Sequence, residues 1–149
     1  MVRLEFHTDV ADPLAYGCRL LRKAYRQRLE VVVSGDPDRL GRLNVLLWTF
    51  EQLEFVPHAR LRGGERPDPA LLGHTPIWLA DAAAAWPQAD VVVNLGEQPV
   101  ANPSRFGRIV EIVGRDADAV LAGRLRWRHY ADQGLSPQKV TGTAADASA

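Results

Sequence analysis

The sequence contains few of the residues that build disulfide or metal sites. Cys18 is the one cysteine in 149 residues, which excludes an internal disulfide and a cysteine-based metal cluster. The four histidines are scattered along the chain, with no pair at close helical spacing: they are His7, His58, His74 and His129. Because closely spaced ligands are the usual mark of a metal site, we expect no bound metal, and we expect no cofactor.

Long apolar runs are also missing. No stretch of about 18 apolar residues occurs, so the sequence predicts no transmembrane helix and no membrane partner. Residues 2–7 alternate apolar and polar side chains, as a half-buried strand does, and do not have the pattern of a signal peptide. We therefore expect a cytoplasmic protein.

Neither sign of charge is in excess. The chain has 18 basic and 18 acidic residues and a formal net charge of zero. A neutral chain argues against a protein whose whole surface coats nucleic acid, although it leaves room for a local basic patch.

The sequence lacks the signatures of nucleotide-binding and hydrolytic enzymes. It has neither the phosphate loop Gly-x4-Gly-Lys nor the nucleophile elbow Gly-x-Ser-x-Gly. The strand-to-helix turn at Gly35 supplies one glycine where the dinucleotide fingerprint needs three. Asp36 and Asp38 would repel a phosphate there and are typical of helix caps. With no nucleophile–base pair in view, the sequence predicts a binding protein without a catalytic site.

Strand and helix patterns alternate along most of the chain. Strands are predicted over residues 2–7, 29–34, 76–79, 90–95 and 108–113, an extended segment over 55–58, and helices after Pro13 and over 39–50 and 117–132. This order predicts an α/β three-layer sandwich with a mostly parallel sheet. We expect a single domain over residues 1–135 and a disordered tail over the small and polar residues 136–149.

The helix predicted over residues 117–132 carries an unusual stripe. Each helical residue advances about 100° around the axis, which aligns four side chains: Val120, Arg124, Trp127 and Arg128. The face expected to dock on the core is a different one and carries Leu121, Ala122, Leu125 and His129.

An exposed tryptophan between arginines is typical of a binding surface. Trp and Arg are enriched at binding hot spots, and the guanidinium group matches a carboxylate or a phosphate. The stripe therefore indicates a ligand with negative charge and an apolar or planar part, such as an acidic peptide ending in an aromatic residue, or single-stranded nucleic acid. In the alternative interpretation, Trp127 folds its ring over a neighbouring strand and the arginine stems pack on it.

A second group of residues lies in the middle of the chain. A helix ending in Leu47-Trp48 is followed by Phe55-Val56-Pro57-His58, by Gly63-Gly64 and by Pro76-Ile-Trp-Leu79. This arrangement, together with the strand over residues 90–95 and the strand–helix pair over 108–134, resembles the chi subunit of the bacterial DNA polymerase III holoenzyme. The resemblance covers about residues 1–135.

The resemblance implies a Rossmann-like domain with no catalytic role of its own in the polymerase complex. It implies two partners. One is the small psi subunit, which links chi to the clamp loader. The other is single-stranded DNA-binding protein, whose acidic C-terminal tail ends in Phe. Contact with DNA would then be mainly indirect.

The family's tail-binding residues can be carried over by position. Its tail-binding arginine falls on Arg124, a tyrosine on Trp127 and a lysine on Arg128, while Val113 would line the pocket for the terminal Phe. Another family lysine falls on Val120, so we expect the same ligand with an altered salt dependence. Arg126 lies roughly 160° from Arg128 around the helix, so we expect it to compensate only partly for the missing lysine.

The psi contact is expected at the end of the second predicted helix and the turn that follows. The candidate residues are Trp48, Phe55, Val56, Pro57 and His58. For each of them, burial in the core is the competing interpretation.

Two other functions compete with a replication adaptor. Direct single-stranded DNA binding would stack bases on Trp127 and place phosphates on Arg124 and Arg128. Zero net charge and a single aromatic residue on the stripe count against it. A nucleotide-dependent enzyme would use the turn at Gly35, and the missing phosphate motif counts against that.

Overall fold

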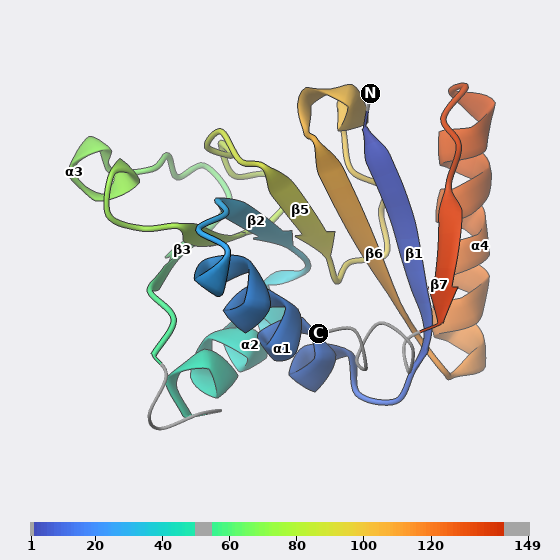
Figure 1. Cartoon of the computed structure of the whole chain (residues 1–149), viewed down its shortest axis with the longest axis horizontal. Helices are drawn as coiled ribbons and strands as arrows, with labels where there is room; N and C mark the ends of the chain where they lie inside the picture. The colour runs from blue at the N-terminus through green and yellow to red at the C-terminus, as the bar shows by residue number, and fades with distance from the viewer. Residues whose placement is uncertain (1, 50–54, 142–149) are drawn as a thin grey trace.

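A seven-stranded, fully parallel sheet forms the centre of the protein (Figure 1). The computed structural model describes residues 2–49 and 55–141. Within these residues the strands lie in the order β3-β4-β2-β5-β6-β1-β7. The predicted three-layer α/β sandwich is confirmed, and the sheet is entirely parallel.

The elements follow the predicted alternation. The strands are β1 (Arg3–Val10), β2 (Val31–Ser34), β3 (His58–Leu61), β4 (Ile77–Ala80), β5 (Val91–Asn94), β6 (Arg108–Gly114) and β7 (Gln138–Thr141). The helices are α1 (Pro13–Arg26), α2 (Pro37–Thr49), α3 (Pro69–Leu72) and α4 (Ala117–Asp132), with a 3-10 turn η1 (Pro103–Arg105). None of the helices in the described part of the chain is long and apolar enough to cross a membrane.

Aspartate side chains cap the starts of α1 and α4. The Asp12 side chain accepts a hydrogen bond from the backbone of Ala15, and Pro13 occupies the first turn of α1. Asp116 caps α4 in the same way through Ala119. These caps satisfy amide groups that a helix start leaves without partners.

Apolar residues on both faces of the sheet bury it between two layers. Valine-rich β2 and β5 are buried along their whole length, as central parallel strands are. The helices α1 and α2 lie side by side against one face, and α4 covers the far part of the other face (Figure 1). Along β1, Phe6 faces α4 whereas His7 faces α1.

Some sequence-based boundaries can be compared with the structure. The segment predicted as extended over 55–58 continues as β3 to Leu61, and the short helix α3 follows at Pro69–Leu72, where the sequence patterns predicted no helix. Residues 80–86, for which the sequence allows a short helix or a turn, contain a turn. Phe50, the predicted end of the second helix, lies outside the described residues.

The disordered tail predicted from residue 136 was wrong for Gln138–Thr141. These residues form β7, which pairs in parallel with β1, with Glu5 opposite Gln138 and Thr8 opposite Thr141. An edge strand is held on one side only, through backbone hydrogen bonds that any side chain allows, so polar residues are acceptable there. Residues 142–149 lie outside the described residues.

Candidate functional site

Helix α4 is fixed to the sheet by a buried polar cluster. Glu111 of β6 is completely buried, and its carboxylate accepts hydrogen bonds from Arg126 Nε at 2.7 Å and from the Tyr130 hydroxyl at 2.6 Å. Asn94 donates to both carboxylate oxygens. Arg126 is only 4% exposed, so the expectation that it partly replaces the family lysine missing at Val120 was wrong.

Burial changes the proton affinities in this cluster. It raises the pKa of Glu111, against the lowering effect of the Arg126 charge. It also raises the pKa of Tyr130 well above its usual range, and the Glu111 charge raises it further. Tyr130 remains a neutral hydroxyl, which donates to Glu111 and accepts from the backbone N–H of Val100 at 2.7 Å.

The face of α4 that docks is not the predicted one. Leu121 and Leu125 are each 58% exposed. The helix approaches β6 instead through Gly123, where an added Cβ would lie 3.0 Å from the Val113 side chain. The apolar pattern indicated the wrong face because Gly123 and the buried Arg126 make the contact with β6.

A pocket of about 610 Å³ opens beside this contact, between α4, β1, the end of β6 and β7. All five predicted tail-site residues line it: Val113, Val120, Arg124, Trp127 and Arg128. Val113 and Val120, with the ring of Trp127, give it apolar walls, and the exposed side chains of Arg124 and Arg128 supply positive charge. The structure therefore brings together residues that span 16 positions of sequence.

Trp127 both packs on a neighbouring strand and forms part of the candidate binding surface. Its ring packs on Phe6 of β1, with centroids 5.0 Å apart and planes at 56°. It is nevertheless only partly buried and lines the pocket. The indole is thus a wall held in place by the core, a rigid surface against which a ligand ring can pack.

Three charged residues that line the pocket were not predicted from the sequence. Lys139 lies on β7, opposite Phe6 of β1. Arg115 follows β6, and its Nε donates to Asp9 Oδ1 at 2.8 Å. Asp9 sits at an irregularity in the β1–β6 pairing and has a left-handed φ of 58°. No local motif marks any of the three, because their neighbours in space come from the opposite end of the chain.

The candidate psi residues form an exposed aromatic group. The rings of Trp48 and Phe55 stack at 4.8 Å with an interplanar angle of 30°, and the two residues are 61% and 47% exposed. His58 lies 5.5 Å from the Trp48 ring, and Pro57 is partly buried beside it. Val56 is the exception, because its side chain is buried in the core, as the competing interpretation had it.

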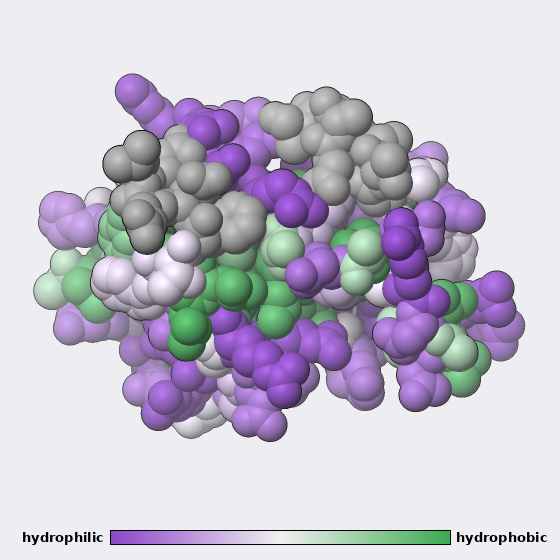
Figure 2. Space-filling model, turned by 90° about the horizontal axis from the view of Figure 1, so that it is seen from below, coloured by the Kyte–Doolittle hydropathy of each residue, from purple (hydrophilic) through white to green (hydrophobic). Residues whose placement is uncertain are grey.

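These aromatic residues belong to a partly apolar face. Figure 2 views the protein from the side of α1 and α2 and shows apolar residues gathered among hydrophilic ones. Val45 of α2 adds to the exposed apolar side chains in this region, at 61% exposure. An exposed group of this kind is typical of a protein–protein contact.

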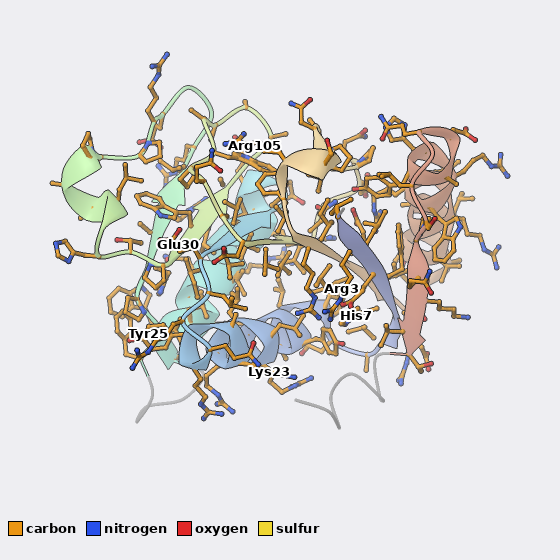
Figure 3. The ribbon with its side chains drawn as sticks, turned by 45° about the horizontal axis from the view of Figure 1, so that its top comes forward. Arg3, His7, Lys23, Tyr25, Glu30 and Arg105 are labelled. Carbon is orange, nitrogen blue, oxygen red and sulfur yellow. The ribbon has the colours of Figure 1, made fainter. Side chains whose placement is uncertain are left out.

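A second polar cluster lies on the α1 side of β1. Figure 3 shows Arg3 and His7 of β1 close to Lys23 of α1. Burial raises the pKa of Glu5, but hydrogen bonds from His7, Arg108 and Arg3 outweigh it and hold this pKa well below its usual range. Because each charge in the Glu5 cluster has a partner, we assign the cluster a structural role.

No group of three or more His, Cys, Asp or Glu side chains in the described ranges could hold a metal ion.

The chain is similar to known proteins over nearly its whole length. A family model described as "DNA polymerase III chi subunit, HolC" matches residues 1–138. A DNA polymerase III subunit chi from Pseudomonas aeruginosa is 29% identical over 144 residues, which cover 93% of this chain and 95% of the relative.

Solved structures share the fold. The C-terminal domain of the DEAD-box protein Dbp5 superimposes with a TM-score of 0.65 at 14% identity, covering 98% of this chain and 93% of that domain. Dbp5 of S. cerevisiae bound to RNA and ADP BeF3 gives a TM-score of 0.65 at 11% identity, covering 97% of this chain and 43% of that one. At these identities the likeness concerns the fold alone.

Proposed function

The chain belongs to the DNA polymerase III chi subunit family and is a replication protein, and we propose that it is the adaptor by which the polymerase complex holds single-stranded DNA-binding protein. In this proposal the α4 pocket takes the acidic C-terminal tail of that protein, and the Trp48–Phe55 surface takes psi.

One observation carries the tail proposal: the α4 pocket has apolar walls, and two exposed guanidinium groups line it. Val113, Val120 and Trp127 offer the apolar surface that a terminal Phe ring needs. Arg124 and Arg128 offer forks for the terminal carboxylate and for acidic residues before it. The chain is neutral overall, so the positive charge here is a local feature.

Exposed aromatic rings support the psi proposal. Trp48 and Phe55 hold each other in one arrangement by stacking, yet most of the indole surface remains in water. Trp is the side chain most typical of interface hot spots, and a rigid pair loses little conformational freedom on binding. His58 is fixed beneath them, since its Nε2 lies 3.0 Å from Asn44 Oδ1 and its Nδ1 lies 2.7 Å from the carbonyl of Val56.

We infer that the protein contributes no catalytic group to the polymerase. The groups whose pKa values are shifted most are held in closed hydrogen-bonded clusters, as described for Glu5, Glu111 and Tyr130. Burial also raises the pKa of the Cys18 thiol to about 11, which leaves it a weak nucleophile at neutral pH.

Peptide binding measured by fluorescence anisotropy tests the tail proposal. The probes are an acidic peptide ending in Pro-Phe, the same peptide without its Phe, and a single-stranded oligonucleotide. We expect binding of the intact peptide only, and its loss in Arg124→Ala. Arg62→Ala is the matched control, because Arg62 is exposed after β3, at the opposite edge of the sheet from α4.

The competing function predicts the reverse pattern. Tight binding of the oligonucleotide with no response to the peptide would overturn the tail proposal and support direct single-stranded DNA binding.

A further inference from the structure

We propose that Lys139 of β7 is a further cationic anchor of the α4 pocket, beside Arg124 and Arg128, and selects acidic residues that precede the terminal Phe of the tail. This inference rests on the proposed function, because it concerns the same ligand. It assigns a role to a strand that the sequence patterns did not predict.

The register of β7 determines where the lysine lies. Lys139 pairs with Phe6 of β1, and Phe6 packs beneath Trp127 on the α4 side of the sheet. Side chains alternate along a strand, so the next residue, Val140, faces the other side, where it packs against the core under α1. The lysine is therefore the β7 residue directed to the pocket, and it lines that pocket with Arg124 and Arg128.

The pocket concentrates positive charge from several elements. Its lining includes four cationic side chains and one carboxylate: Arg115, Arg124, Arg128, Lys139 and Asp9. Arg115 is already paired with Asp9, so part of its charge is compensated. Among the described residues, by contrast, none forms a hydrogen bond or ion pair with Lys139 that would compensate its ammonium group.

Lys139 also fits the departure from the family pattern that removes a positive charge. The resemblance places a family lysine at position 120, where this chain has Val120. Val120 and Lys139 line the same pocket, from α4 and β7 respectively. A cation supplied from β7 restores a charge contact that α4 lacks, and it leaves Val120 to extend the apolar wall.

A different role for Lys139 must be distinguished. Lysine on an edge strand also discourages pairing with another chain. A lysine that only prevents strand pairing would not contact the peptide, whereas a pocket residue would. The two roles therefore predict different results in a binding experiment.

The composition of the chain allows a direct test. Lys23 and Lys139 are its two lysines, and they lie on opposite sides of the sheet, because Lys23 belongs to α1. Reductive methylation with a ¹³C label keeps both charges and gives each lysine its own NMR signal. Lys23→Arg and Lys139→Arg variants assign the signals and separate them from the labelled N-terminal amine.

We expect the acidic peptide ending in Pro-Phe to shift the Lys139 signal and to leave the Lys23 signal in place. A peptide that keeps the Phe but has its aspartates replaced by asparagine should bind less tightly and shift Lys139 less. Lys139→Gln should weaken binding about threefold at low salt and flatten its salt dependence, while Lys139→Arg retains binding. Lys23→Gln, the matched control, should bind as wild type does.

The outcomes separate the two proposals. If wild type binds the peptide and Arg124→Ala does not, but the Lys139 signal is unmoved and Lys139→Gln binds normally, the role of Lys139 is overturned and the tail proposal stands. If wild type does not bind the peptide, both are overturned. An unchanged thermal unfolding of Lys139→Gln shows that a weaker affinity does not come from loss of β7.

Discussion

Arg126 of α4 and Glu111 of β6 form an ion pair inside the protein, with Arg126 Nε 2.7 Å from Glu111 Oε1 and side chains that are 4% and 0% exposed. A pair without access to water is stabilising only while both charges and their hydrogen bonds are present. It fixes the rotation of α4, and with it the direction of the arginines at the pocket.

Removal of one partner of this pair should be more harmful than removal of both. Arg126→Met leaves the Glu111 carboxylate buried without its cation, and we expect the free energy of unfolding to fall by about 3 kcal/mol or more. The double variant Arg126→Met with Glu111→Gln should recover part of this loss. Urea unfolding followed by circular dichroism measures both values, and equal losses in the two variants would contradict a stabilising charge pair.

Gly123 should not tolerate a larger residue. An added Cβ would meet Val113 at 3.0 Å, so Gly123→Ala pushes α4 away from β6 and should cost about 1 kcal/mol or more of unfolding free energy. Val113→Ala in the same chain makes room for the methyl group and should reduce the loss. Gly73→Ala is a suitable control, because nothing lies within 4 Å of its added Cβ.

The aromatic pair should matter for partner binding more than for stability. Trp48→Ala and Phe55→Ala remove exposed side chains, so unfolding free energies should change little, whereas psi binding should weaken about tenfold or more. Leu71→Ala and Leu72→Ala on α3 are matched controls, since these leucines are 42% and 43% exposed elsewhere on the surface. Titration calorimetry with psi decides this, and normal binding by Trp48→Ala would reject the proposed surface.

The free energy of unfolding should fall at low pH because Glu5 has a lowered pKa in the folded protein. Its pKa is lowered in the folded protein, so the unfolded chain takes up a proton first as the pH falls below about 4.5, the ordinary value. The stabilisation is therefore complete above that pH and is lost as the pH falls further toward the folded-state pKa, with a slope of up to about 1.4 kcal/mol per pH unit.

Glu5→Gln lacks this titration. The difference in unfolding free energy between wild type and Glu5→Gln should thus shrink between pH 5 and pH 3, to be measured by urea unfolding at about four pH values. A difference that stays constant over this range would show that the carboxylate is not held by His7, Arg108 and Arg3 as described.

Asp9 places a negative charge in a pocket proposed for an acidic ligand. Asp9→Asn removes that charge and releases Arg115, so we expect the acidic peptide to bind about twofold more tightly at low salt. Asparagine accepts the left-handed φ of 58° at this position, which keeps the backbone in place. A lower affinity, measured by anisotropy, would mean that the Asp9–Arg115 pair orders the pocket.

Periodicity predicted the parts of the fold that follow simple patterns. The valine runs of β2 and β5 and the helix over Ala117–Asp132 were found where they were expected, because repeated side chains report on both burial and secondary structure. β7 was not predicted, because Val140 is its one apolar residue and gives no pattern. The strand is held in place by backbone pairing with β1.

The candidate site was partly accessible from the sequence. The stripe on α4 and the family resemblance supplied five of the residues that line the pocket. The role of Arg126 was not accessible, because arginine is seldom buried and its partner Glu111 lies in a different element. Lys139 could not be assigned to the pocket without the register of β7.

The position of β1 in the sheet bears on how the protein is made. The two neighbours of β1 are β6 (Arg108–Gly114) and β7 (Gln138–Thr141), so β1 is synthesised long before either strand that pairs with it. β2 and β3 can pair once β4 has been made, and β5 then joins β2, whereas β1 stays unpaired until β6 is made and keeps one open edge until β7 is made. The lining of the α4 pocket includes β1 and β7, so the pocket is completed late in synthesis. A chain stalled before residue 138 would have a nearly complete sheet but an incomplete pocket.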